Sequence, residues 1–298
     1  MARRILVTGA TGKLGKRVVE RLLKKNSEVR ILTRRPEEAR RLWGDAVEVA
    51  QGDFADPPSL KEALVDIDAL FLLSPISEAL ASHQNAAVDA AASAGIERIV
   101  KVSGSDWTIR NADRSVSGSA HALVEAHLAE SGVAHTILRP NAWMQVALEP
   151  TIAAILSRED LPDRYSGAAV SYIDADDIAD VSVAALTKET PLNGAFVLTG
   201  GKALTALEIG RIAARILHRP IGVSQTVHTA LPSHPGTFEQ KAVGEFCVLI
   251  AEGLASSLSD DVRRITGREP RTVDAYLSAR LAGADIPTHN PKGEKSWH

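Results

Sequence analysis

The segment TGATGKLG at residues 8–15 constrains the fold more than any other feature. It joins an apolar run, RILVT, to an amphipathic stretch at residues 13–25. Gly9 allows a tight turn, Gly12 lets backbone N–H groups approach a phosphate, and Gly15 lets a helix pack closely against a strand. The positive end of that helix also favours a bound anion. The segment therefore predicts a strand–turn–helix unit that binds the pyrophosphate of a dinucleotide.

The same strand–helix alternation continues through the first two-thirds of the chain. Apolar runs predict six strands, at residues 4–8, 29–33, 47–50, 69–73, 98–103 and 135–139. Helical patterns separate them, at residues 13–25, 36–43, 59–65, 82–94 and 117–131. Nearly continuous apolar strands that alternate with helices are typical of a parallel sheet covered on both faces. We expect an α/β fold with a doubly wound parallel Rossmann sheet.

The alternation weakens after residue 141. Strands are expected at residues 170–173 and 196–199, and helices at residues 176–187, 206–217, 239–254 and 272–282. A Pro/His-rich loop at residues 231–235 and a polar, frayed tail at residues 287–298 complete the prediction. We expect an NADP-binding Rossmann domain over residues 1–145, to which residues 170–200 return. A smaller, mostly helical, substrate-binding lobe is expected over residues 146–298.

Composition excludes several classes of protein. The net charge of −3 over 298 residues leaves no basic surface of the kind that binds nucleic acid. One cysteine, Cys247, excludes an internal disulfide framework and fits a reducing compartment. The strand pattern begins too early for a signal peptide, and no apolar run reaches the roughly 18 residues of a membrane helix. We expect a cytoplasmic protein with a small-molecule partner and no nucleic-acid or membrane partner, either a monomer or a homodimer.

The end of the second predicted strand indicates which dinucleotide binds. Arg34 and Arg35 stand where NAD-binding proteins usually carry an acid that holds the ribose hydroxyls. A guanidinium instead suits a 2′-phosphate. Arg34, helped by Arg35 and Lys13, therefore predicts NADP(H) in preference to NAD(H), and a solvated charge pair is the alternative. Asp53 is expected to accept a hydrogen bond from the adenine amino group, and Phe54 to pack near it.

Several segments together resemble one known family. They are TGATGxxG, Gly52-Asp-Phe54, Leu72-Leu-Ser-Pro75, and residues 131–140, 173–179, 198–200 and 266–271. In these segments the chain resembles the NmrA-like family of atypical short-chain dehydrogenase/reductases over residues 3–282. That family contains NADPH-dependent quinone and triphenylmethane-dye reductases, and also NADP(H)-binding proteins that regulate transcription. The resemblance implies a cofactor-binding fold more firmly than it implies a reaction.

The resemblance also assigns candidate residues. In this family the loops after strands four, five and six line the nicotinamide end of the site. The candidates for cofactor binding are Gly9, Thr11, Gly12, Lys13, Leu14, Gly15, Arg34, Asp53, Phe54, Leu73, Ser74, Pro75, Ser103 and Pro140. The candidates for substrate binding are Ser105, Trp107, His121, Asn141, Trp143 and Met144. Trp107, Trp143 and Met144 would form the apolar wall that a flat aromatic substrate needs, and ordinary core packing is the alternative.

The usual catalytic pair of short-chain dehydrogenases, Tyr-x-x-x-Lys, does not occur in this sequence. The residues four positions after the three tyrosines are alanine, aspartate and arginine. No lysine occurs between Lys101 and Lys188, which also removes the helix lysine of the related pinoresinol and isoflavone reductases. At the expected position the chain has His121 and Glu125, a pair that the NmrA-like group commonly shows.

His121 and Glu125 lie one helical turn apart on the same face of a predicted helix. In one interpretation His121 relays a proton and Glu125 orients its ring. In a second the pair positions the loop after the fifth strand, and in a third both side chains are solvated. Ser103 either contacts a substrate oxygen or caps its own turn. His121 and Ser103 are the catalytic candidates.

Three functions are compatible with these residues. The first is an oxidoreductase, an NADPH-dependent reductase of a small aromatic or conjugated acceptor such as a quinone, dye, imine or ketone. The second is a non-catalytic NADP(H)-sensing protein, and the third a non-redox isomerase. No metal site is expected, because the acidic run at residues 174–177 lies where Asp176 or Asp177 would cap a helix. Cys247 lies in an apolar run and is predicted to be buried and inert.

Overall fold

A seven-stranded parallel sheet forms the centre of the computed structural model, which describes residues 3–225 and 236–282. The strands follow the order β3-β2-β1-β4-β5-β6-β8, and each neighbouring pair is parallel. Their bounds are β1 Arg4–Val7, β2 Glu28–Thr33, β3 Glu48–Gln51, β4 Ala69–Leu72, β5 Arg98–Val102, β6 Ala134–Pro140 and β8 Gly194–Leu198. The order reverses between β1 and β4, which is where doubly wound sheets bind ligands beyond the carboxyl ends of their strands.

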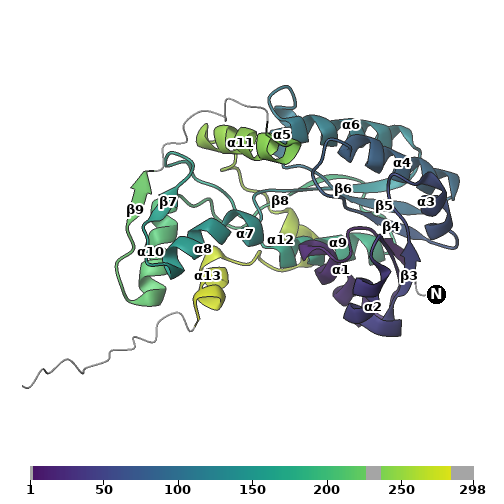
Figure 1. Cartoon of the computed structure of the whole chain (residues 1–298), viewed down its shortest axis with the longest axis horizontal. Helices are drawn as coiled ribbons and strands as arrows, with labels where there is room; N and C mark the ends of the chain where they lie inside the picture. The colour runs from purple at the N-terminus through teal and green to yellow at the C-terminus, as the bar shows by residue number, and fades with distance from the viewer. Residues whose placement is uncertain (1–2, 226–235, 283–298) are drawn as a thin grey trace, which may run out of the picture.

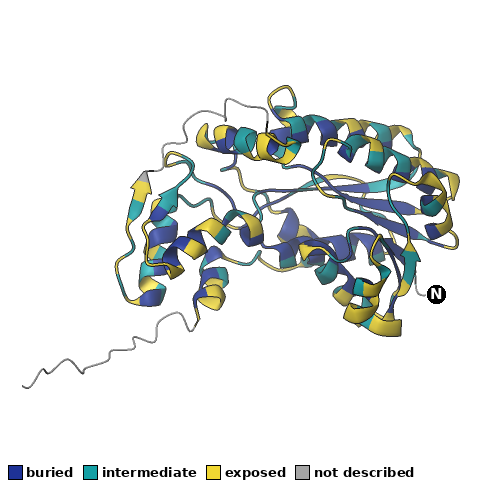
Figure 2. Ribbon diagram, in the orientation of Figure 1, coloured by how far each residue is buried: buried dark blue, intermediate teal, exposed yellow. Residues whose placement is uncertain are grey.

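Helices cover both faces of this sheet (Figure 1). One face carries α1 (Lys13–Lys24), α2 (Pro36–Trp43), α9 (Ala175–Thr187) and α12 (Asp261–Thr266). The other carries α3 (Pro57–Ala63), α4 (Leu80–Ser93) and α6 (Val116–Glu130). Side chains alternate across β1, so that Ile5 and Val7 enter one apolar cluster and Leu6 enters the other. Figure 2 shows the sheet buried between these two layers, and the predicted fold class is confirmed.

A second group of elements lies beside the sheet and has an apolar cluster of its own. It contains α7 (Met144–Ala147), α8 (Glu149–Leu156), α10 (Ala206–Leu217), α13 (Val273–Leu281), β7 (Leu161–Asp163) and β9 (Val223–Gln225). The two short strands pair in parallel. Helix α11 (Phe238–Ala251) follows, and the short α5 (Asp106–Arg110) leads into α6. The chain leaves the sheet after β6 to build this lobe and returns to it with α9 and β8.

The predicted strand at residues 170–173 is wrong, and the small strands β7 and β9 were not predicted. The segment makes only two isolated bridges, one from Val170 to Leu204 and one from Ile173 to Trp143. Between them the Ser171 hydroxyl donates to the carbonyl oxygens of residues 255 and 257. The segment is apolar because it is buried, but no neighbouring strand runs along its length.

The acidic run after this segment caps α9, as predicted, but through a different residue. Asp174 is the N-cap, and its carboxylate accepts a hydrogen bond from the backbone N–H of Asp176. Asp177 is fully buried and binds Arg271 instead. Cys247 is buried, as predicted. The predictions for residues 231–235 and 287–298 lie outside the described residues.

Two kinds of feature are absent from the described ranges, 3–225 and 236–282. No helix in them is long and apolar enough to cross a membrane. They also hold no group of three or more His, Cys, Asp or Glu side chains placed to bind a metal ion.

Candidate active site

The glycine loop joins β1 to α1 and brings backbone atoms very close together. Gly9 has a positive φ of 63°, a conformation that favours glycine, and its carbonyl oxygen accepts a hydrogen bond from the Gly12 N–H. A Cβ atom on Gly15 would lie 2.1 Å from the Gly9 oxygen. Thr8 fixes the loop to the neighbouring strand β4. Its hydroxyl contacts the carbonyl oxygens of Phe71 and Leu73 and accepts a hydrogen bond from the Leu73 N–H.

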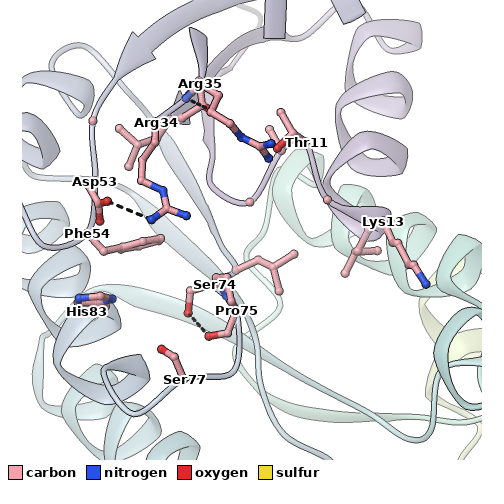
Figure 3. Close-up of a pocket in the computed structure, with 18 of the residues that line it drawn as sticks. Thr11, Lys13, Arg34, Arg35, Asp53, Phe54, Ser74, Pro75, Ser77 and His83 are labelled. Carbon is pink, nitrogen blue, oxygen red and sulfur yellow. Dashed lines mark hydrogen bonds and ion pairs between the residues drawn. The ribbon is translucent and has the colours of Figure 1, made fainter. Parts of the chain in front are cut away.

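A cavity of about 580 Å³ opens above this loop, at the carboxyl ends of β1 to β4 (Figure 3). Most cofactor candidates line it: Gly9, Thr11, Gly12, Lys13, Leu14, Arg34, Asp53, Phe54, Leu73, Ser74 and Pro75. Gly15, Ser103 and Pro140 are not among its lining residues. Of the substrate candidates, Trp143 lines it. The structure thus brings together, around one cavity, residues that are more than 130 positions apart in the sequence.

Arg34 and Arg35 extend from the end of β2 along the rim of this cavity (Figure 3). The Arg34 side chain is 75% exposed, and its Nη1 atom lies 3.6 Å from Asp53 Oδ2. Arg35 is 70% exposed and pairs with Glu38. Asp53 itself caps a turn, since its Oδ1 accepts a hydrogen bond from the N–H of Ala55. Each of these two exposed guanidinium groups thus has one carboxylate beside it, and Arg34 has the looser of the two contacts.

Lys13 points away from the other labelled side chains in Figure 3. Its ammonium donates a hydrogen bond of 2.9 Å to the backbone oxygen of Gln145, in α7. The Gln145 amide in turn donates to Asp174 and accepts from the N–H of Ala175, at the start of α9. Lys13 therefore connects the glycine loop to the first helix of the lobe.

Two residues that the sequence did not predict line the cavity near Phe54. The ring of Phe54 stacks with the ring of His83 from α4, with centroids 6.1 Å apart and planes 12° apart. Ser77 lies beside them on the cavity wall. His83 and Ser77 belong to no strand–turn–helix motif, so the sequence held no local signal for them.

The substrate candidates lie farther along the carboxyl edge of the sheet. Trp107 donates its indole N–H to Asn141 Oδ1 over 2.8 Å and packs edge-on against Phe246 of α11, with ring centroids 5.7 Å apart. The Asn141 amide N–H groups go to Ser171 and to the carbonyl oxygen of Ala255. All of these side-chain groups of Asn141 are used inside the protein. Asn141 therefore holds Trp107 in place.

The other substrate candidates have more varied surroundings. Ser105 donates to the carbonyl oxygen of Pro140, which ties the loop after β5 to the end of β6. Met144 is fully buried in the lobe cluster and lines a second cavity, of about 370 Å³. That second cavity lies between α10, α13 and residues 200–204. Of the three residues predicted to form the substrate wall, Trp143 lines the cavity above the glycine loop, and Trp107 and Met144 do not.

A buried network of charged and polar groups lies beneath the loop after β5. Lys101, in β5, lies with its Nζ atom 3.0 Å from His121 Nδ1 and donates to Ser103 Oγ over 3.1 Å. Ser103 Oγ donates to Glu125 Oε1 over 2.5 Å. Glu125 also binds Arg139 of β6, and Arg139 binds Asp106 of α5. Strands β5 and β6 and helices α5 and α6 each supply part of this network.

Burial sets the ionisation of two groups in the network. Burial lowers the pKa of Lys101 to about 7, although the Glu125 carboxylate opposes this shift and raises it. Burial also holds the pKa of His121 well below its usual value, and the charge of Lys101 lowers it further. His121 is therefore a neutral imidazole. Its Nδ1 atom accepts from Lys101, so we assign the ring proton to Nε2.

This geometry bears on all three interpretations of His121 and Glu125. The solvated interpretation is wrong, because both side chains are buried. Glu125 does not orient the His121 ring either, since the carboxylate reaches Ser103 and Arg139, and Lys101 holds the ring. Glu125 fixes Ser103 at the end of β5, as the second interpretation holds. A catalytic role for His121 or Ser103 stays a prediction.

Lys101 is the member of this network that the sequence did not predict. The helix position of the usual catalytic lysine gives no guide to it, because Lys101 comes from the neighbouring strand. One signal was present: in RIVKVS, at residues 98–103, a lysine interrupts a strand predicted to be buried on both faces. A charge at such a position is costly and calls for a partner.

Comparison with known proteins identifies the family. The model of a family described as NAD(P)H-binding matches residues 9–189. The chain is 31% identical over 285 residues to an NAD(P)H azoreductase of Xenophilus azovorans, which covers 93% of this chain and 98% of the relative. It is 33% identical over 292 residues to a (4-alkanoyl-5-oxo-2,5-dihydrofuran-3-yl)methyl phosphate reductase of Streptomyces griseus, covering 95% and 99%.

Solved structures agree with this fold. The NADP(H) complex of a triphenylmethane reductase from Citrobacter sp. superposes with a TM-score of 0.81 at 21% identity, covering 93% of this chain and 100% of that one. The motifs, the sheet order and these matches point to one group. The chain belongs to the NAD(P)H-binding family, in agreement with the resemblance of its sequence to the NmrA-like reductases.

Proposed function

We propose that this chain is an NADPH-dependent reductase that transfers hydride to a small aromatic or conjugated organic acceptor, such as a dye, quinone, imine or ketone. The single observation that carries the proposal is the cavity of about 580 Å³, which runs from the glycine loop and Arg34 to Trp143. One end of it has the chemistry that binds phosphate, and the other has an indole suited to a flat ring. Relatives named as an azoreductase and a furanone phosphate reductase support this assignment.

The proposed cofactor residues divide the work between backbone and side chains. The N–H groups of residues 11–15 hold the pyrophosphate at the positive end of α1. Phe54 and His83, whose rings stack on each other, would form the cavity wall for the adenine, and Ser74 and Pro75 would line the part that holds the rest of the dinucleotide. The nicotinamide supplies the hydride when it is bound. The lobe, reached through Trp143 and Trp107, covers the acceptor and keeps water away from the reacting atoms.

The proposed preference for NADPH rests on Arg34 and Arg35. Arg34 is three-quarters exposed and has only a 3.6 Å contact with Asp53, so its guanidinium can turn to a 2′-phosphate at little cost. No acid stands at the end of β2 to bind the ribose hydroxyls of NAD. Each charge-assisted hydrogen bond to a phosphate contributes about 1.5–3 kcal/mol.

Exchange of Arg34 for an acid tests this preference. Arg34→Asp removes the phosphate contact and adds a repulsive charge, so we expect it to raise the dissociation constant for NADPH by about 10- to 100-fold. Binding of NADH should change by less than about threefold. Arg40→Asp, the same charge change on the exposed face of α2, is the control and should leave both constants unchanged. Tighter binding of NADH than NADPH by the wild-type protein would contradict the proposed preference.

Turnover separates a reductase from a non-catalytic NADP(H)-binding protein. We expect the protein to oxidise NADPH in the presence of at least one azo dye, triphenylmethane dye, quinone, imine or ketone. Loss of NADPH absorbance is the measurement, and titration of NADP⁺ against the protein fluorescence is the accompanying control. Tight NADP⁺ binding without turnover of any acceptor would favour the sensor instead.

A further inference from the structure

Lys101 is fully buried in the centre of the sheet. The residues around it in β5 are apolar and buried, and a Leu or Met would fill the same space. Taking an isolated ammonium out of water is costly unless other groups compensate for the loss. The contacts that compensate for it go to Ser103 and His121, the two residues predicted to be catalytic.

The Lys101 ammonium uses its donors on the two catalytic candidates. The Nζ atom lies 3.0 Å from His121 Nδ1 and 3.1 Å from Ser103 Oγ, with a longer contact of 3.4 Å to its neighbour's carbonyl oxygen. Ser103 is held by both of its neighbours, because it accepts from Lys101 and donates to Glu125. The Ser103 hydroxyl proton is therefore used in the hydrogen bond to Glu125. Of the two partners of Lys101, His121 is the one that can donate a proton elsewhere.

The two nitrogens of the His121 ring have different surroundings. Nδ1 accepts from Lys101, so Nε2 carries the ring proton. Within residues 3–225 and 236–282, Nε2 makes no hydrogen bond. The ring lies directly under the loop after β5, where a Cβ atom on Gly104 would come 3.1 Å from the His121 Cδ2 atom. A proton that leaves Nε2 can be replaced at Nδ1 from the lysine behind it.

Charged groups on three elements face Lys101. Glu125 of α6 favours the ammonium, and Arg139 of β6 disfavours it. Asp106 of α5 acts at a greater distance, through its ion pair with Arg139. His121 is neutral and accepts the hydrogen bond. Burial lowers the pKa of Lys101 to about 7, so this ammonium can release and regain a proton near neutral pH.

We propose that Lys101 holds the proton for the reduction and supplies it, through His121, to acceptors that need a proton after they take up hydride. This inference rests on the proposed reductase function. Lys101 acts through His121 and does not touch the acceptor, so it is a positioning residue for His121 as well as a proton store. It replaces the helix lysine of ordinary short-chain dehydrogenases with one from the adjacent strand.

The step balances for an azo acceptor. Hydride adds to one nitrogen of N=N, the π bond breaks, and its electron pair moves to the second nitrogen. That nitrogen takes the proton from His121 Nε2 while Nδ1 takes one from Lys101 Nζ, which becomes a neutral amine. Water then returns a proton to the amine. A cationic triphenylmethane dye differs, because hydride alone converts its central carbon to the neutral leuco form and no proton is needed.

Two dyes therefore test the inference in one enzyme. Methyl red serves as the azo acceptor and crystal violet as the cationic acceptor, each with NADPH and the full-length protein. We expect Lys101→Met to lower kcat for the azo dye at least tenfold, in line with the usual contribution of general acids, which is about 10²–10⁴-fold. We expect kcat for crystal violet to stay within about twofold, since hydride transfer to a cation needs no general acid. His121→Gln should give the same selective loss.

The pH profile gives a second readout. In the wild-type enzyme, azo reduction should fall as the pH rises through about 7, because the Lys101 ammonium then loses its proton. Crystal violet reduction should not show this fall, and Lys101→Met should abolish it. This measurement keeps the inference testable even if Lys101→Met fails to fold.

Arg98→Met is the matched control. Arg98 is a buried cation at the other end of the same strand, where it binds the carbonyl oxygens of residues 185, 188 and 189. It should leave the ratio of the two dye activities unchanged. If Lys101→Met lost both dye activities equally, or lost neither, the inference about Lys101 would be overturned and the proposed reductase function would stand. A wild-type protein that reduces crystal violet but no azo dye would overturn the inference too, and one that reduces neither would overturn the proposed function.

Discussion

Gly15→Ala is expected to raise the dissociation constant for NADPH about 100-fold, the largest effect on binding that we expect from a single methyl group. An alanine in a helix is normally more stable than a glycine by about 0.5–1 kcal/mol. Here the added Cβ would lie 2.1 Å from the Gly9 oxygen and 2.6 Å from the Ala10 Cα atom. Both are backbone atoms, so the phosphate-binding loop must move. A shift of α1 away from the loop then removes the N–H groups from the pyrophosphate.

The measurement is a fluorescence titration of NADPH, together with a thermal melt. Overpacking of this size costs about 1–3 kcal/mol in stability, so the variant should still fold. Gly201→Ala is the control, because its nearest neighbour would be the Pro270 Cγ atom at an ordinary 3.8 Å. Unchanged NADPH affinity in Gly15→Ala would contradict the packing argument.

Glu125→Ala is expected to destabilise the protein by about 3 kcal/mol, because it removes one partner from a buried ion pair. The change leaves the Arg139 guanidinium with Asp106 as its remaining acid partner, and it removes the acceptor of the Ser103 hydroxyl. Chemical denaturation monitored by fluorescence gives the free energy of unfolding. The structure makes Glu125 more important for stability than for the chemical step.

Glu252→Ala is the matched control for that loss. Glu252 accepts two hydrogen bonds from Arg114, but this pair lies on the surface. A surface pair is screened by water, so its removal should change stability far less. A comparable loss in the two variants would refute the importance that we assign to burial. Loss of Glu125 also removes a charge that raises the pKa of Lys101, so the fall in azo reduction should move to lower pH.

Local spacing was enough to predict the cofactor half of the site. A glycine loop, the end of the next strand and the turn after the third strand are each short segments whose residues act close to where they stand in the sequence. Arg34 and Phe54 therefore lie on the cavity, as predicted. In a parallel sheet the carboxyl ends of neighbouring strands converge, so the motif and the sheet order together place these side chains at one edge.

The buried network around Lys101 depends on contacts between elements, which the spacing of residues in the sequence does not reveal. Lys101 meets His121 only because α6 packs on β5, and Arg139 meets Glu125 only because β6 lies beside that strand. Helical spacing did place His121 and Glu125 on one face. It could not show that they have different partners, because that depends on the residues of two adjacent strands. Similarly, the apolar run at residues 170–173 signals burial equally well for a strand and for an irregular segment.

The position of β8 affects how the whole molecule unfolds. This strand completes the sheet beside β6, yet residues 141–193 lie between the two strands in the sequence. Those residues build part of the lobe and then α9, which packs on α1. An ordered excursion, with α9 packed on the same sheet, helps to hold this last strand in place. Heat or denaturant should therefore melt the lobe and the cofactor-binding sheet together, as one cooperative unit.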